Sequence, residues 1–239
     1  SGVAESFRSI RTNLQYFTDK PGGQRILVTS LHPGEGKTFC TINMAAIIAS
    51  AGKKVLILDF DMHKPKVHLS MRLPNEAGLS SYIAGRYSLE EVLQKTEYSN
   101  LDVITAGEVP PNASELVLSP KVEELLAKLD QEYEYILVDT PPLMLISDSM
   151  VLLRHMDIGL FVMNTDKATR SGVRQLEEIV AANKLSHMAL ILNNVKPKRW
   201  QYYYSRYGYR YGYGYGYGYG YGYGYGYGYG RDANHKDRK

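Results

Sequence analysis

Leu31-His32-Pro33-Gly34-Glu35-Gly36-Lys37-Thr38 is the stretch that decides the fold of this 239-residue chain. The apolar run Arg25–Ser30 before it predicts a buried strand, and residues 39–50 after it predict a helix. A strand, a glycine loop ending in Lys-Thr and a helix are together typical of a phosphate-binding loop. Gly34 and Gly36 let backbone N–H groups turn toward an anion, and the helix N-terminus adds its positive dipole.

The loop predicts a site for ATP and Mg²⁺. We expect Lys37 to reach the terminal phosphates and the hydroxyl of Thr38 to hold Mg²⁺. Leu31 departs from the usual motif, which has glycine at that position. An ordinary glycine turn is the alternative, and the acidic motifs that follow disfavour it. The residues assigned to the nucleotide here are Gly34, Glu35, Gly36, Lys37, Thr38 and Phe39.

Two later apolar runs end in aspartates. Lys54–Leu58 predicts a buried strand that leads into Asp59-Phe60-Asp61, and residues 135–138 predict another that leads into Asp139. Ligands of open α/β sheets bind at the carboxyl ends of strands, so we expect these carboxylates beside the phosphates. Asp139 after an apolar strand is typical of a Walker B motif, whose carboxylate holds Mg²⁺. For Asp59 and Asp61 the alternative is a cap or turn.

Strands and helices alternate throughout residues 25–195, which predicts a doubly wound, mainly parallel α/β sheet. The last strand ends in Asn193-Asn194 at the ligand edge. We assign Asn193 to the nucleotide, although a strand-end turn explains it equally well. The remaining strands are expected at 101–105, 158–164 and 187–194, and helices at 78–84, 89–95, 113–132 with a break at Pro120, from Asp148 to about His155, and 168–184.

Composition separates a domain over residues 1–195 from a basic tail over 196–239. The domain holds 19 Lys and Arg against 23 Asp and Glu, a net of −4, and the tail holds 9 against 2, a net of +7. Cys40 is the single cysteine, so no disulfide forms within the chain, and we expect a buried apolar role for it. No run reaches the length of a membrane span, and the start at Ser1 suggests a processed or excised segment.

Residues 3–18 predict an amphipathic helix, because apolar residues from Val3 to Phe17 recur every three or four positions. Glu5, Arg8 and Arg11 form a polar stripe on another face. A solvated helix face and an ionic surface for a neighbouring subunit both explain the stripe, and spacing alone favours the solvated face.

The tail is rich in tyrosine, with 15 of the 21 tyrosines between Tyr202 and Tyr229 and strict Tyr-Gly alternation over residues 211–230. Such a composition predicts disorder, because it cannot bury a core. Three interpretations stay open: a sticky linker, a nucleic-acid binder that stacks aromatics on bases, or a multisite phosphate acceptor. We favour the acceptor, since phosphorylation would turn a basic tail strongly negative.

These motifs together resemble the bacterial tyrosine kinases that control capsule and exopolysaccharide synthesis. Residues 33–38 resemble their Walker A motif, 57–61 their Walker A′ and 136–142 their Walker B, although His63 stands where the family usually has arginine. Glu5, Arg8 and Arg11 match the family's E-x-x-R-x-x-R stripe. The resemblance implies a P-loop fold of the deviant-Walker ATPase type, tyrosine autophosphorylation in trans, and a ring, suspected to be an octamer. The resemblance therefore changes our interpretation of the stripe from a solvated helix face to a subunit interface.

The resemblance also implies roles and partners. Lys37, Asp59 and Asp61 are the expected catalytic residues, with Asp59 as the acceptor of the tyrosine proton, and Thr38, Asp61 and Asp139 are the expected Mg²⁺ ligands. We expect a membrane co-polymerase or activator, a phosphotyrosine phosphatase, no nucleic acid, and a cytoplasmic location at the inner face of the plasma membrane. The runner-up function is a partition-type ATPase switch without kinase activity. The expected phosphoacceptors are Tyr202, Tyr203, Tyr204, Tyr207, Tyr209, Tyr211 and Tyr213.

Overall fold

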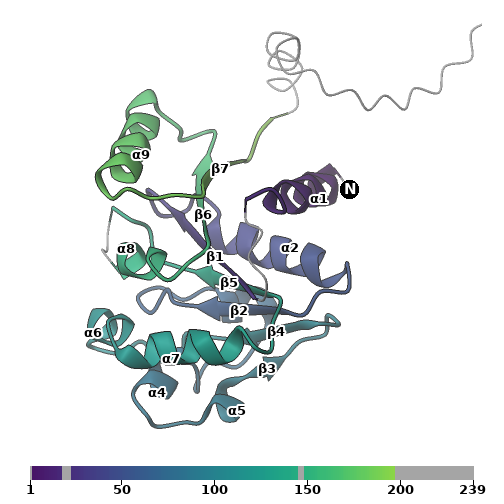
Figure 1. The fold of residues 1–239 in the computed structure, drawn as a ribbon, viewed down its shortest axis with the longest axis vertical. Coiled ribbons are helices and arrows are strands. Elements are labelled where there is room, and N and C mark those ends of the chain that lie inside the picture. Colours follow the sequence, from purple (N-terminus) through teal and green to yellow (C-terminus); the bar gives the residue numbers. More distant parts are fainter. Residues whose placement is uncertain (1, 18–22, 145–147, 197–239) are drawn as a thin grey trace, which may run out of the picture. The chain divides into compact units, whose positions relative to one another are not determined.

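A single sheet runs through the computed structural model, which describes residues 2–17, 23–144 and 148–196 (Figure 1). Its strand order is β3-β4-β2-β5-β1-β6-β7, and all neighbours pair in parallel except β3, which is antiparallel to β4. The strands of this sheet are β1 (Gln24–Ser30), β2 (Val55–Asp59), β3 (Gln94–Lys95), β4 (Leu101–Ile104), β5 (Tyr135–Asp139), β6 (Ile158–Asn164) and β7 (Met188–Asn193).

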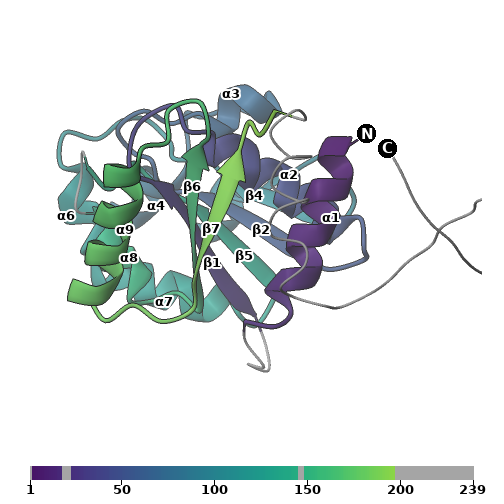
Figure 2. The same ribbon diagram turned by 90° about the horizontal axis from the view of Figure 1, so that it is seen from above.

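Helices cover both faces of the sheet (Figure 2). One face carries α1 (Gly2–Leu14), α2 (Lys37–Ala49) and α3 (Val67–Met71). The opposite face carries α4 (Leu79–Ile83), α5 (Leu89–Val92), α6 (Ala113–Val117), α7 (Pro120–Leu129), α8 (Asp148–Leu153) and α9 (Arg170–Ala182). The prediction of a doubly wound, mainly parallel sheet is confirmed.

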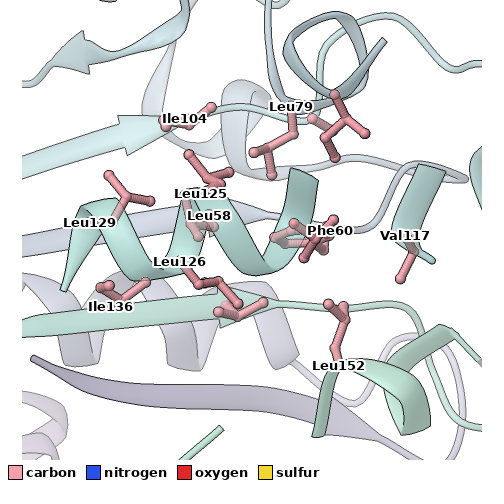
Figure 3. Packing of buried hydrophobic residues seen from close by; sticks show 14 of the residues in the cluster. Leu58, Phe60, Leu79, Ile104, Val117, Leu125, Leu126, Leu129, Ile136 and Leu152 are labelled. Atoms are coloured by element: carbon pink, nitrogen blue, oxygen red, sulfur yellow. The ribbon is translucent and has the colours of Figure 1, made fainter. Parts of the chain in front are cut away.

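The central strands are apolar on both faces because each face is covered by helices. Along β1, Ile26 and Val28 pack toward α1 and α2, whereas Leu27 between them packs into the opposite layer. Figure 3 shows that opposite layer, where α7 lays Leu125, Leu126 and Leu129 over the sheet. Apolar layers therefore pack on both faces of the sheet and hold the carboxyl ends of its strands in place.

Several predicted boundaries need correction. Residues 89–95 were expected to be one helix, but α5 ends at Val92 and the two-residue strand β3 follows. The first helix ends at Leu14 instead of residue 18, and Val3, expected on its apolar face, is 52% exposed. The short helix α3 was not predicted.

The division into a domain over 1–195 and a tail over 196–239 stays a prediction, because the tail beyond Lys196 lies outside the described residues. Cys40 is buried as expected, and burial raises the pKa of its thiol to about 12. No helix within the described ranges is long and apolar enough to cross a bilayer.

Candidate active site

The glycine loop joins the end of β1 to the start of α2. Gly34 has φ 76° and Gly36 has φ 98°, both in the left-handed region where a side chain is strained. Leu31, which replaces the first glycine of the usual motif, is buried and packs against Phe161 and Leu176. The departure at Leu31 thus has a physical reason: its side chain fills the core beneath α9.

Glu35 braces the loop from inside. Its side chain is buried, and Oε2 accepts a hydrogen bond from the backbone N–H of His32 at 2.9 Å. The assignment of Glu35 to the nucleotide stays a prediction, and this geometry leaves only its backbone for that task.

Lys37 opens α2 and reaches toward the acidic strand ends. Its Nζ lies 3.9 Å from Oδ2 of Asp61, and the residue is 8% exposed. Asp61 in turn accepts a hydrogen bond from the backbone N–H of Lys64 through Oδ1, at 3.0 Å. An ammonium shielded in this way interacts strongly with an added phosphate, because less water screens it.

Asp59 and Asp139 lie opposite one another in the register of β2 and β5. Both are fully buried. Burial, with the charges of Asp139 and Asp61, raises the pKa of Asp59 well above its usual value. Burial also raises the pKa of Asp139 to about 6, although the Lys37 charge and the hydrogen bond from Thr38 act in the other direction. The strand ends therefore concentrate negative charge where a cation would relieve it.

Oxygen atoms suited to Mg²⁺ meet where α2 faces β5. Oγ1 of Thr38 donates to Oδ2 of Asp139 at 2.6 Å, and Oγ1 of Thr41 lies 3.3 Å from Oδ1. Within the described chain no group of three or more His, Cys, Asp or Glu side chains forms a metal cage. A pair of protein oxygens fits Mg²⁺, which prefers to keep waters and phosphate oxygens as its other ligands.

Thr41 was missed in the sequence. Its hydroxyl also donates to the backbone oxygen of Lys37 at 3.0 Å, so it links the first turn of α2 to Asp139. The signal that could have found it is spacing: position 41 lies one helical turn after Lys37 and shares its face.

Asn193 ends β7 beside the glycine loop. Its Nδ2 donates to the backbone oxygen of Glu35 at 3.0 Å. A β-carbon built on Gly36 would lie 2.1 Å from that Nδ2. The structure therefore brings Asn193 to the loop, while its contact with a nucleotide stays a prediction.

Phe39 lies in the first turn of α2 and contacts α1. Its ring is 48% exposed and meets Phe7 of α1 edge to face, with centroids 5.9 Å apart. An exposed ring next to the loop remains compatible with the assigned nucleotide contact.

The stripe on α1 divides into two parts. Arg8 pairs with Glu5 at 2.8 Å on the exposed surface. Arg11 is half-buried, and its NH1 donates to the backbone oxygen of Ile47 in α2 at 3.3 Å. The assignment of all three residues to a subunit interface stays a prediction, and Arg11 within the stripe also contacts α2. The expected phosphoacceptors, Tyr202 to Tyr213, lie outside the described residues.

Comparisons with known proteins extend these observations. Residues 23–191 match the family model described as AAA domain. The tyrosine-protein kinase YwqD of Bacillus subtilis is 34% identical over 205 residues, which is 86% of this chain and 85% of YwqD. The tyrosine-protein kinase Etk of Escherichia coli is 35% identical over 180 residues, and this chain spans only 25% of the length of Etk.

Solved structures agree with this picture. The kinase domain of Escherichia coli ETK superposes with a TM-score of 0.77 at 32% identity, covering 90% of this chain and 80% of that one. The septum-site-determining protein MinD of Pyrococcus horikoshii, complexed with Mg-ADP, superposes with a TM-score of 0.60 at 22% identity, covering 75% of this chain and 76% of that one. The likeness to MinD is one of fold alone.

Proposed function

The chain belongs to the bacterial tyrosine kinases, and on that premise we propose that it transfers the γ-phosphate of ATP to tyrosines of its own C-terminal tail. The observation that carries the proposal is the convergence of Lys37 and Thr38, at the start of α2, on two aspartates: Asp139 at the end of β5 and Asp61 just after the end of β2. The tail supplies acceptors, since it holds 15 tyrosines.

Each side chain has a task in this proposal. Lys37 neutralises charge on the β- and γ-phosphates, and backbone N–H groups from Gly34 to Thr38 hold the phosphates in place. Thr38 and Asp139 would hold Mg²⁺, which when bound would supply positive charge to offset that of the phosphates, and Asp61 would support its water shell. A charged site of this kind lowers the barrier mainly by positioning and electrostatics.

Asp59 is proposed to accept the proton of the incoming tyrosine. Its two oxygens accept backbone hydrogen bonds from Asp61 at 3.1 Å and Val67 at 3.3 Å. A tyrosine hydroxyl therefore reaches Asp59 only after the segment 61–67 has moved. The raised pKa of Asp59 supports the role, because a stronger base accepts the proton more readily.

We further propose that the reaction occurs in trans within a ring of subunits, for which eight is the suspected number. Exposed Glu5 and Arg8 support this interface. The ring would sit at the inner face of the plasma membrane with a polysaccharide co-polymerase or activator. Phosphorylated tails would repel one another and release the ring, which a phosphatase would restore, and this cycle would regulate polymer export.

The test is mass spectrometry of the purified full chain after incubation with Mg-ATP. Phosphotyrosine should accumulate between Tyr202 and Tyr229 and should be absent from the Lys37→Met variant. Label that persists in Lys37→Met would exclude this site as its source. ATP hydrolysis without any phosphotyrosine would instead support the partition-type switch.

A further inference from the structure

Lys167 lies beside the glycine loop, although no motif includes it. It belongs to the turn between β6 and α9, and a β-carbon built on Gly34 would lie 3.3 Å from its Nζ. Gly34 itself has a φ of 76°. An ammonium thus stands next to the backbone that is expected to bind phosphate.

The turn that carries Lys167 is held by a set of hydrogen bonds. The N–H of Lys167 donates to the backbone oxygen of Asn164 at 2.9 Å, and the N–H of Asp166 donates to Oδ1 of Asn164 at 3.0 Å. Thr165 donates to the end of β7 twice: its N–H to the oxygen of Asn193 at 3.0 Å and its hydroxyl to the oxygen of Asn194 at 2.8 Å. The backbone under Lys167 is therefore fixed to the end of β7.

Both carboxylate oxygens of Asp166 contact other residues, so Asp166 does not neutralise the charge of Lys167. Its Oδ2 accepts from Nδ2 of Asn194 at 2.9 Å, and its Oδ1 pairs with Nζ of Lys196 at 3.1 Å. None of the ion pairs between described residues involves Lys167. The ammonium of Lys167 is thus a cation at the loop in addition to the buried Lys37.

We propose that Lys167 contacts the bound nucleotide, its ammonium pairing with phosphate oxygens of ATP or ADP held in the glycine loop. The proposal rests on the proposed ATP site and adds a ligand to it from the turn after β6, which lies outside the three Walker motifs. The same strand end is joined to Asn193, whose amide holds the oxygen of Glu35. The loop is therefore approached from the β6–β7 side by one amide and one ammonium.

Lys167→Met tests the contact, because methionine keeps the length of the side chain and removes the charge. We expect the Kd of the full chain for ATP and for ADP to rise roughly tenfold, the size expected for a charge-assisted hydrogen bond. The affinity should also depend less steeply on salt, because one cation fewer is screened. Lys167→Arg should restore both the affinity and its salt dependence.

Lys128→Met is the matched control, since Lys128 is an exposed lysine in the last turn of α7. Its nucleotide affinity should equal that of the unmodified chain. Equal affinities of Lys167→Met and Lys128→Met would overturn the proposal. Weak binding by both Lys167→Met and Lys167→Arg, with an unchanged salt dependence, would also overturn it in favour of a structural role.

Calorimetric binding of ATP and ADP separates this inference from the kinase function. A chain that binds ATP but forms no phosphotyrosine would contradict the proposed function and still allow Lys167 to be tested. A chain whose Lys37→Met variant loses ATP binding while Lys167→Met does not would keep the function and remove the role of Lys167.

Discussion

Oγ1 of Thr38 and Oδ2 of Asp139 lie 2.6 Å apart and share a hydrogen bond. The two atoms come from the first turn of α2 and the end of β5, 101 residues apart in the sequence. These two oxygens would hold Mg²⁺, and Asp139 would have to be ionised to do so. The strength of the metal site is therefore linked to the protonation of a buried carboxylate.

Asp139→Asn should abolish phosphotransfer and at the same time stabilise the metal-free protein. Burial raises the pKa of Asp139 to about 6, so keeping this carboxylate ionised at pH 7.5 costs the folded state free energy. The partners Thr38 and Thr41 are hydroxyls, which can donate or accept and so tolerate an amide. We expect an increase of about 1–3 kcal/mol in the free energy of unfolding in urea.

Asp59→Asn is the control for that experiment. The partners of Asp59 are backbone N–H groups of Asp61 and Val67, which cannot accept from an amide. The gain from removing charge should therefore be smaller than for Asp139→Asn. An equal gain, or a loss of stability in Asp139→Asn, would contradict the electrostatic account.

The stability of the metal-free protein should fall as pH rises from about 4 to about 6. The folded pKa of Asp139 lies above the unfolded value of 3.8, so the native state holds more protons in this interval. Urea unfolding at several pH values in chelator measures the slope. Asp139→Asn should flatten it, and an unchanged slope in that variant would assign the effect to other groups.

Gly36→Ala should abolish ATP binding and destabilise the fold by about 1–3 kcal/mol. The new methyl group would collide with Nδ2 of Asn193 and would sit at a φ of 98°. Gly52→Ala is the matched control, because Gly52 has a φ of 85° but no atom within 4 Å of a built β-carbon. Equal losses in the two variants would show that the collision with Asn193 contributes nothing.

Arg8→Ala and Arg11→Ala should behave differently. Arg8 is exposed, so its loss should give smaller species in sedimentation while stability stays within about 0.5 kcal/mol. Arg11 also holds the oxygen of Ile47, so its loss should in addition destabilise the fold by about 0.5–1.5 kcal/mol. An unchanged sedimentation profile in the double variant would contradict the subunit interface and support a solvated helix face.

Deletion of residues 202–230 should remove nearly all phosphotyrosine and leave ATP affinity unchanged. Tyr133 is a poor acceptor, because its buried hydroxyl donates to Asp102 at 2.7 Å and burial raises its pKa. Peptide mass spectrometry locates the remaining label. Most of the label on Tyr82 or Tyr87 would mean that the tail is not the main acceptor.

Much of the architecture was predictable because long apolar runs such as Ile158–Asn164 leave one interpretation. Short elements were not: β3 has two residues and α3 has five, too few for any periodicity to appear. The exposure of Val3 could not be predicted either. The spacing of apolar residues shows which side chains share a face of α1, but not how much of that face the neighbouring helix covers.

The site was predictable where a motif fixes geometry and unpredictable where it depends on tertiary packing. Lys37, Thr38 and Asp139 follow from strand ends and a glycine loop. Burial of the Glu35 side chain depends on the local turn at His32, and the position of Lys167 depends on the pairing of β6 with β1. An exposed loop lysine carries no pattern of its own.

The hydrogen bond between Asn193 and Glu35 joins the last strand of the domain to its first loop. On the ribosome the loop is made 158 residues before Asn193. A nascent chain therefore lacks the hydrogen bond that Asn193 gives to the glycine loop until β7 has been synthesised.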